Sequence, residues 1–175
     1  MPQVDLSRVP VFYHNYILQV MEEDLSDAMQ KHQLNLVSVL KNIPDEKWDY
    51  RYAEGKWSIK ELVQHIIDSE RIFCYRALNF ARKDSNELPG FDENEFAAVS
   101  KADKRSKQDL LEELITVQRS SLQLFASFDE EQLDQSGKAN GNSIYVKGIG
   151  FIIVGHAIHH SNVLMERYLQ KKIPA

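Results

Sequence analysis

The sequence predicts an all-α protein, a four-helix bundle with an N-terminal arm. Four long segments carry apolar residues at the 3.6-residue spacing of an α-helix, and almost nowhere do apolar and polar residues alternate over the length of a strand. The chain has 175 residues, 43% of them hydrophobic and 27% charged, which suits one compact domain with a single large core. We therefore expect one domain over residues 1–175, in which residues 1–23 form the arm.

An arm and a first long helix are expected before Pro44. Residues 10–21 are rich in aromatic and aliphatic side chains, which indicates a short helix or an arm packed across the bundle. A helix is predicted from about Asp24 to Asn42, and Pro44 closes it because proline cannot continue a helix. The apolar stripe of this helix consists of Leu25, Met29, His32, Leu36, Leu40 and Ile43.

The second helix has the clearest start in the sequence. Ser58 and Glu61 stand at the spacing of a capping box, in which each side chain satisfies a free backbone N–H, and the helix is expected to end near Lys83. Its inward stripe consists of Leu62, His65, Ser69, Ile72, Phe73, Arg76 and Phe80. Because an ordinary core has aliphatic residues at such positions, the polar members of the stripe indicate a polar pocket around His65.

The third helix follows a long linker, residues 84–105. The linker contains a predicted turn at residues 88–91, with Phe91 and Phe96 as expected anchors on the bundle. Antiparallel neighbouring helices usually need only about two to eight connecting residues, so the second and third helices are expected to run parallel. The third helix begins at Ser106 and places inward Leu110, Leu114, Val117, Ser121, Phe125 and Phe128.

The last helix is the most apolar segment of the chain. Residues 137–147 are expected to form a loop that ends in a short extended segment, and the helix to run from about Gly148 to Gln170. The apolar stretch within it, residues 149–158, is interrupted by two glycines and a histidine and falls short of the roughly 20 apolar residues of a membrane-spanning helix. We therefore expect a core helix and no association with a membrane.

Charge and cysteine content exclude several classes of function. The 21 basic and 26 acidic residues give a net charge of −5, and no basic stripe with interleaved aromatic residues occurs, so a nucleic-acid partner is not expected. A single cysteine, Cys74, excludes an intramolecular disulfide and a cysteine-rich zinc site, and we expect it to be a buried thiol. Residues 1–5 lack the basic start and apolar run of a signal peptide, which predicts a cytoplasmic protein.

Three of the six histidines lie within five residues, at positions 156, 159 and 160. His156 and His160 are four residues apart, so on a helix their Cβ atoms lie about 5–6 Å apart on one face. That face also carries the apolar side chains of the last helix, so both imidazoles are expected to point into the core. Two imidazoles at this separation can bind one metal ion. His65, in its polar stripe, is the best candidate for a third ligand.

Three neutral imidazoles suit zinc, nickel, iron or cobalt, with zinc and nickel as our first choices. They leave at least one position on the metal open, which is typical of a reactive rather than a structural site. The sequence has neither the His-Glu-x-x-His motif of metalloproteases nor the paired Glu-x-x-His motifs of ferritin-like dinuclear iron sites. A mononuclear three-histidine site is therefore the metal site that we predict.

The other histidines have more ordinary explanations. His159 lies to one side of the inward face, where it could support a metal ligand, be a fourth contact to the metal or be solvated. His32 is expected to be a hydrogen-bonded core residue, and His14 to lie on the surface.

Two stretches of the chain resemble the DinB-like family. The run from Gly55 to Phe73, GKWSIKELVQHIIDSERIF, followed by Arg76 and by LPGFD at residues 88–92, is similar to one of the family's patterns. GHAIHH at residues 155–160 is similar to the motif of the family's final helix. Together these stretches extend the resemblance over most of the chain.

The resemblance implies a four-helix bundle of up-down-down-up topology, in agreement with the parallel helices expected from the long linker. It also implies a divalent metal held by His65, His156 and His160, and a homodimer. The family includes bacillithiol and mycothiol S-transferases and a maleylpyruvate isomerase that uses a thiol cofactor, and many members are known only as candidate metal-dependent hydrolases.

Three functions are compatible with these residues. In the first, the metal binds a low-molecular-weight thiol as its thiolate, which attacks an electrophilic small molecule, while Arg76 holds a carboxylate of the thiol. In the second, the metal lowers the pKa of a bound water towards about 7, and Glu70 or His159 assists proton transfer during hydrolysis. In the third, the protein is a dimer that binds a metal or a small molecule without catalysis.

Overall fold

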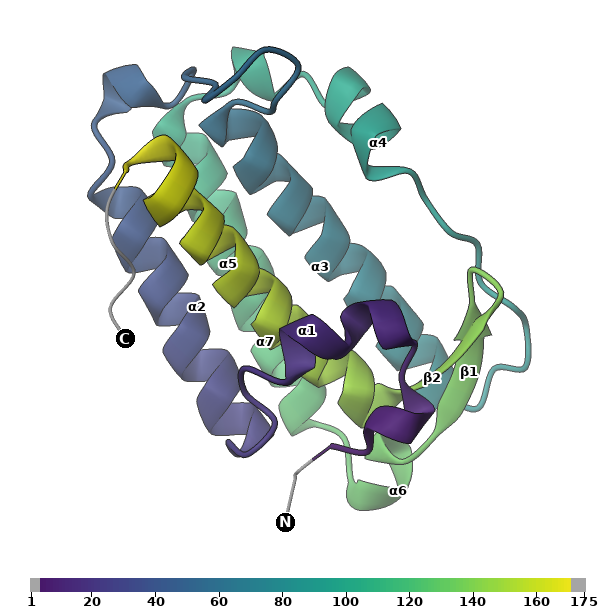
Figure 1. The fold of residues 1–175 in the computed structure, drawn as a ribbon. Coiled ribbons are helices and arrows are strands. Elements are labelled where there is room, and N and C mark those ends of the chain that lie inside the picture. Colours follow the sequence, from purple (N-terminus) through teal and green to yellow (C-terminus); the bar gives the residue numbers. More distant parts are fainter. Residues whose placement is uncertain (1–3, 171–175) are drawn as a thin grey trace.

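The computed structural model describes residues 4–170 and confirms the all-α four-helix bundle (Figure 1). Residues 1–3 and 171–175, which we expected to belong to the domain, lie outside the described part, and Met1–Gln3 also carried part of the signal-peptide argument. The bundle helices are α2 (Leu25–Lys41), α3 (Ile59–Ala81), α5 (Lys107–Ala126) and α7 (Val146–Val163). The smaller elements are α1 (His14–Ile17), α4 (Glu93–Val99), α6 (Glu130–Leu133), β1 (Ser136–Ala139), β2 (Asn142–Tyr145), a π-helical turn at Leu164–Tyr168, and 3₁₀ turns at Leu6–Arg8, Val11–Tyr13, Asp45–Lys47 and Ala102–Lys104.

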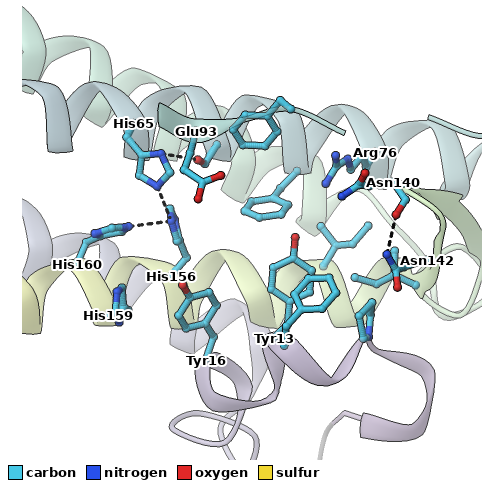
Figure 2. Close-up of a pocket in the computed structure, with 18 of the residues that line it drawn as sticks. Tyr13, Tyr16, His65, Arg76, Glu93, Asn140, Asn142, His156, His159 and His160 are labelled. Carbon is cyan, nitrogen blue, oxygen red and sulfur yellow. Dashed lines mark hydrogen bonds between the residues drawn. The ribbon is translucent and has the colours of Figure 1, made fainter. Parts of the chain in front are cut away.

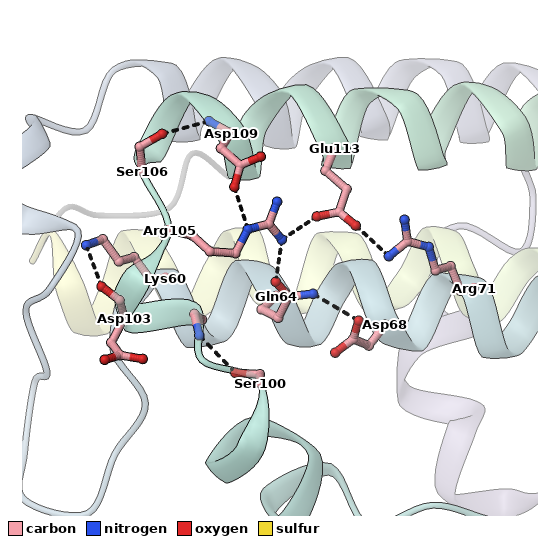
Figure 3. A network of polar contacts seen from close by, with 11 residues as sticks. Lys60, Gln64, Asp68, Arg71, Ser100, Asp103, Arg105, Ser106, Asp109 and Glu113 are labelled. Atoms are coloured by element: carbon pink, nitrogen blue, oxygen red, sulfur yellow. Dashed lines mark hydrogen bonds and ion pairs between the residues drawn. The ribbon is translucent and has the colours of Figure 1, made fainter.

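Side-chain contacts between α3 and α5 show that these two helices run parallel. Arg105, just before α5, donates a hydrogen bond of 2.6 Å to Gln64 near the start of α3 (Figure 3). Further along both helices, Arg71 pairs with Glu113 at 2.6 Å. Figure 1 shows α2 and α7 running in one direction and α3 and α5 in the other, which is the expected up-down-down-up topology. The long linker makes this possible because it returns the chain to the end of the bundle where α3 began.

The starts of three bundle helices follow from their capping residues. The Asp24 side chain accepts hydrogen bonds from two backbone N–H groups of α2, and Ser106 accepts one at the start of α5. Ser58 and Glu61 form the predicted capping box, with Ser58 Oγ accepting from the Glu61 N–H at 3.2 Å and Glu61 Oε2 accepting from the Ser58 N–H at 2.7 Å. The predicted starts are therefore confirmed.

The core consists of two apolar clusters with polar side chains between them. One cluster contains the start of α2, the end of α3 and most of α7, and the other contains the opposite ends of these helices. Buried polar residues of α2, α3 and α5 stand between the two clusters, and we name them the interior polar layer: Gln33, Glu70, Gln118 and Ser121. At this level Gln33 of α2 donates to Glu70 of α3 at 3.5 Å, and Cys74 of α3 donates to Ser121 of α5 at 3.2 Å.

The N-terminal arm packs across α7, as expected (Figure 1). A Cβ atom added at Gly155 of α7 would lie 2.3 Å from the carbonyl oxygen of Tyr16. Glycine at this position therefore allows the backbone of α1 to approach α7 closely. As a result, the aromatic side chains of the arm lie beside the histidine-containing part of α7.

The segment between α6 and α7 differs from the expected loop. Residues 136–145 form an antiparallel β-hairpin whose turn residues Asn140 and Gly141 have positive φ angles of 51° and 74°. An Asn-Gly pair favours this kind of two-residue turn. The strands are four residues long, too short to give a clear alternating pattern, which is why the sequence predicted a loop. The hairpin is followed directly by α7, two residues earlier than expected.

The linker also differs from the expectation, because it contains α4 and the 3₁₀ turn at Ala102–Lys104. Phe96 of α4 was expected to anchor the linker, but its side chain is 43% exposed and stacks on Phe91, with ring centroids 5.1 Å apart. The prediction for Phe96 was wrong because linker residues have no periodic pattern that indicates which side chains face the bundle.

Helix α7 with its π-helical turn, Val146–Tyr168, is longer than the apolar stretch that the sequence indicated. Its 23 residues are long and apolar enough, by length and composition, to cross a membrane, which corrects the expectation that it falls short. However, 67% of its most apolar window is buried inside the protein, where it packs on α1, α2 and α3. It therefore has the packing of a core helix.

Candidate metal centre

Three histidine side chains from two helices converge at one end of a cavity (Figure 2). His65 comes from α3, and His156 and His160 come from α7. The Nε2 atom of His156 lies 3.1 Å from Nε2 of His65 and 2.9 Å from Nε2 of His160. One nitrogen from each ring lies within 4.8 Å of the other two. The structure thus brings together the three histidines that the sequence singled out.

Burial keeps the three imidazoles uncharged. It lowers the pKa of His65 to about 4, an effect that the charge of Glu93 opposes and His159 reinforces. Burial, reinforced by the neighbouring histidines, also lowers the pKa values of His156 and His160 well below the ordinary range. Neutral imidazoles have a free nitrogen lone pair, which is the form that binds a metal ion.

Hydrogen bonds alone do not satisfy the three rings. Nε2 of His156 faces two other Nε2 atoms but has a single lone pair or a single proton to offer. Nδ1 of His160 is buried without a hydrogen-bond partner among residues 4–170. Imidazole ligands at about 2.0–2.1 Å from a tetrahedral zinc lie about 3.3 Å from one another, close to the separations observed here. The donor set therefore fits a divalent metal such as zinc.

The cavity beside the histidines has a volume of about 430 Å³, within the usual range for a small-molecule site. Tyr13 and Tyr16 of the arm form one wall, and Tyr16 stacks on His159, with ring centroids 5.2 Å apart. His159 is half-buried and lines the cavity beside His160, and burial lowers its pKa. It is thus placed to exchange a proton with a molecule in the cavity.

Arg76 also lines the cavity, as the sequence suggested, at the end away from the histidines (Figure 2). Glu70 does not line it, which corrects the role in proton transfer that the sequence suggested. Glu70 lies five positions after His65, so at about 100° per residue the two side chains point about 140° apart around α3. Glu70 instead faces Gln33 of α2, with Gln33 Nε2 3.5 Å from Glu70 Oε1, inside the interior polar layer.

The sequence did not identify several polar residues of the cavity. Glu93, the first residue of α4, lies beside His65 in the cavity (Figure 2) and acts electrostatically on its pKa. Asn140 and Asn142 enter the cavity from the hairpin. The Asn-Gly pair at the turn was the one available signal, whereas Glu93 lies in the linker, where no pattern indicates direction.

The remaining histidines and the cysteine lie elsewhere. Nε2 of His32 is 3.3 Å from a carboxylate oxygen of Glu23, in keeping with the expected hydrogen-bonded role. His14 was expected on the surface but is half-buried, because its Nε2 lies 3.1 Å and 3.0 Å from two backbone carbonyl oxygens of the arm. Cys74 is half-buried, and burial raises the pKa of its thiol to about 12, so it is not a reactive thiolate at neutral pH.

Comparison with known proteins identifies relatives of the chain. Residues 28–164 match the model of the DinB superfamily. A candidate metal-dependent hydrolase from Oceanobacillus iheyensis is 31% identical over 127 residues, which cover 68% of this chain and 72% of that protein.

Two solved structures from Bacillus subtilis have a similar fold. YfiT, a probable metal-dependent hydrolase with an unusual four-helix bundle topology, matches with a TM-score of 0.72 at 16% identity, covering 87% of this chain and 89% of YfiT. The DinB-like protein YjoA matches with a TM-score of 0.63 at 19% identity, covering 86% and 95% of the two chains. At these identities, the likeness establishes the fold alone.

Proposed function

The chain belongs to the DinB superfamily, and we propose that it is a divalent-metal-dependent enzyme acting on a small molecule. The observation that supports this proposal best is the convergence of three neutral imidazoles at the end of a cavity that admits a small molecule. His65, His156 and His160 are the proposed ligands, and zinc or nickel the proposed metal. A metal bound there supplies a positive charge that lowers the pKa of a bound thiol or water.

The reaction that we propose first is transfer of a low-molecular-weight thiol to an electrophile. In that reaction Glu93 or His159 accepts the thiol proton, and the sulfur electron pair forms a new sulfur–carbon bond. The leaving group departs with the electron pair of the bond that breaks. Arg76 would bind a carboxylate of the thiol, as a buried cation at the far end of the cavity.

Hydrolysis is the second candidate, and the names of the relatives from Oceanobacillus iheyensis and Bacillus subtilis favour it. The same residues, Glu93 and His159, would then accept a proton from the attacking water. Glu93 takes the place of Glu70 in this reading, because Glu70 faces away from the cavity.

We also propose that the protein is cytoplasmic, forms a homodimer and has no nucleic-acid or membrane partner. Val11 and Phe12 of the arm are exposed apolar side chains that a second copy would cover. Light scattering at micromolar concentration tests the dimer, and a mass near that of one chain, 20.3 kDa, would contradict it.

Turnover assays distinguish the two reactions. Full-length protein reconstituted with zinc or nickel is assayed with a thiol plus an alkylating electrophile, and separately with ester and amide substrates. We expect activity with one of the two sets, lost on chelation and in His156→Ala. If neither set is turned over although about one metal ion per chain is retained after desalting, the protein binds a metal without these activities.

A further inference from the structure

The end of the cavity away from the histidines is built around a buried positive charge. The Arg76 side chain is 7% exposed, its Nη2 donates a hydrogen bond of 3.0 Å to the carbonyl oxygen of Pro89, and its Nε is buried without a partner. Among residues 4–170, no carboxylate pairs with this guanidinium. A buried charge without a counter-charge is costly, so an anion from outside the chain would stabilise it.

The β-hairpin and the linker form the part of the cavity wall beside Arg76. Both backbone polar groups of Leu88 form hydrogen bonds with the hairpin. Its N–H donates to Lys138 O at 2.9 Å, and its carbonyl accepts from the Asn140 N–H at 3.0 Å. These bonds fix the chain that carries the Pro89 carbonyl beside the turn of the hairpin. Arg76, the linker and the hairpin are therefore joined into one wall of the cavity.

Gly90 leaves room for the Asn140 side chain in the position that it occupies. A Cβ atom added at Gly90 would lie 2.4 Å from Oδ1 of Asn140, so only glycine leaves room for that amide. Asn140 itself has a φ of 51°, a conformation that asparagine tolerates better than most residues. The local sequence thus permits an amide side chain in the part of the cavity that Arg76 lines (Figure 2).

Tyr13 completes the group from the opposite wall. Tyr13 and Arg76 line the same cavity, from the arm and from α3 (Figure 2), and burial raises the pKa of the Tyr13 phenol, a shift that the charge of Arg76 opposes. The phenol therefore remains protonated at neutral pH and can donate a hydrogen bond. A guanidinium, an amide and a phenol together offer several donors to one planar anion.

We propose that this end of the cavity is a carboxylate-binding subsite formed by Arg76, Asn140 and Tyr13, and that the substrates of the protein are small carboxylic acids. The guanidinium can donate two parallel hydrogen bonds to the two oxygens of a carboxylate. A ligand with a neutral amide in place of the carboxylate offers one oxygen and no charge, so it would not satisfy the guanidinium. The inference rests on the proposed function only for the reaction at the histidine end of the cavity. Binding of the carboxylate itself does not require the metal.

The arrangement also fixes how the acid lies in the cavity. His65 and Arg76 are eleven residues apart on α3, so their Cα atoms are separated by roughly 16 Å along the helix axis. An Arg side chain bends back towards the start of its helix, which shortens the distance that a ligand must span. Glu93 lies close to His65 and disfavours a carboxylate beside the histidines when no metal is bound. The reacting atom of the ligand must therefore be several bonds from its carboxylate.

A matched pair of probes tests the subsite. Isothermal titration of 4-phenylbutyrate and of its neutral amide is carried out on the full chain, once metal-free and once loaded with zinc. We expect the carboxylate to bind in both states and the amide to bind at least about tenfold more weakly, because a charged hydrogen-bonding pair is lost. Equal binding of the acid and the amide, or no binding of the acid in either state, would overturn the proposal.

Three variants locate the binding. Arg76→Gln removes the charge, and Asn140→Asp keeps the shape and the turn but places a negative charge in the subsite, so each should weaken the acid at least about tenfold. Arg82→Gln, which removes an exposed charge at the end of the same helix, should leave binding unchanged. If Arg76→Gln does not fold, Asn140→Asp still decides the question, and unchanged affinity in it would contradict the subsite.

One further variant separates this inference from the proposed function. His156→Ala should lose zinc binding but keep the affinity for 4-phenylbutyrate. If binding of the acid instead requires zinc and is retained in Arg76→Gln and Asn140→Asp, the acid binds at the histidines. The proposed subsite is then wrong, although the metal centre stands. If zinc does not bind to the wild type but the acid does, the metal centre is wrong and the subsite stands.

Discussion

The three histidines and the interior polar layer are both groups of buried polar side chains, but they differ in what surrounds them. The histidines form the end wall of a cavity of about 430 Å³. Gln33, Glu70, Gln118 and Ser121 lie between two apolar clusters and face other helices of the bundle. The first group can be completed by a molecule from outside, whereas the second can be completed only from within the fold.

Burial has the same physical effect in the two places with opposite chemical results. It lowers the pKa of His65 to about 4 and raises the pKa of Glu70 to about 7, because in each case it disfavours the charged form. For a histidine the neutral form is the metal ligand, while for Glu70 the neutral form is a hydrogen-bond donor inside the bundle. A shifted pKa alone therefore does not identify a functional site. The group must also line a cavity that a ligand can enter.

The largest effect is expected from removal of a histidine ligand. His65→Ala, His156→Ala or His160→Ala leaves a two-ligand site, which should weaken metal binding by several orders of magnitude. Because a metal that binds the folded state also stabilises it, these variants should lose most of the zinc-induced rise in melting temperature. Thermal melts with and without zinc measure this.

His32→Ala is the control for the ligand variants, because it removes a histidine outside the cavity. It should lose stability equally with and without zinc and keep the zinc-induced shift. A full zinc-induced shift in His156→Ala or His160→Ala, together with its loss in His32→Ala, would show that the ligand assignment is wrong.

Glu70 should give the next largest effect, on the pH dependence of stability. Its carboxyl titrates near 4.5 when unperturbed and near 7 in the folded protein, so between these pH values the folded chain holds a proton that the unfolded chain has released. The stability contributed by Glu70 therefore falls as the pH rises from 4.5 to 7, by about 3 kcal/mol in total.

Glu70→Gln tests this, because an amide mimics the protonated carboxyl. In the metal-free protein the histidines have the opposite slope, since their lowered pKa values make stability rise with pH in the same range. The difference in unfolding free energy between variant and wild type isolates Glu70, and it should grow in favour of the variant from pH 4.5 to pH 7. Glu112→Gln, an exposed site on α5, is the control, and an equally flat difference in both variants would refute the prediction.

The third prediction concerns His159, which lines the cavity beside His160 without being one of the three converging rings. Loss of a group that supports a metal ligand usually costs about 10–100-fold in metal affinity or activity. His159→Ala should fall in this range, well short of the ligand variants. Zinc titration by competition with a chelator measures it, and a loss as large as that of His160→Ala would make His159 a ligand.

The histidine centre could be predicted because its signals are local. The spacing of His156 and His160 fixes their common face, and the capping box at Ser58 fixes the start of the helix that carries His65. The direction of Glu70 was equally predictable, since a separation of five residues from His65 excludes a common face.

The rest of the site depends on contacts that no periodic pattern records. Glu93 reaches the cavity from the linker, and Asn140 from a hairpin of four-residue strands. The position of each depends on how the linker and the hairpin pair at Leu88, a contact between segments about fifty residues apart. The sequence predicts helices and their faces, but a single sequence does not predict such pairings.

The smallest effect, on the free energy of unfolding, is expected at Gln118 of the interior polar layer. Its side chain is 3% exposed, and like Nδ1 of His160 its amide nitrogen and amide oxygen are buried without a hydrogen-bond partner among the described residues. Unlike the histidines, it does not line the cavity, so no substrate can complete it. Replacing an unpaired buried amide by an apolar group of similar shape removes a desolvation cost of about 1–3 kcal/mol without losing a hydrogen bond. Gln118→Met should therefore leave the unfolding free energy unchanged or raise it, whereas a clear loss in urea denaturation would mean that the amide has a partner, such as a buried water.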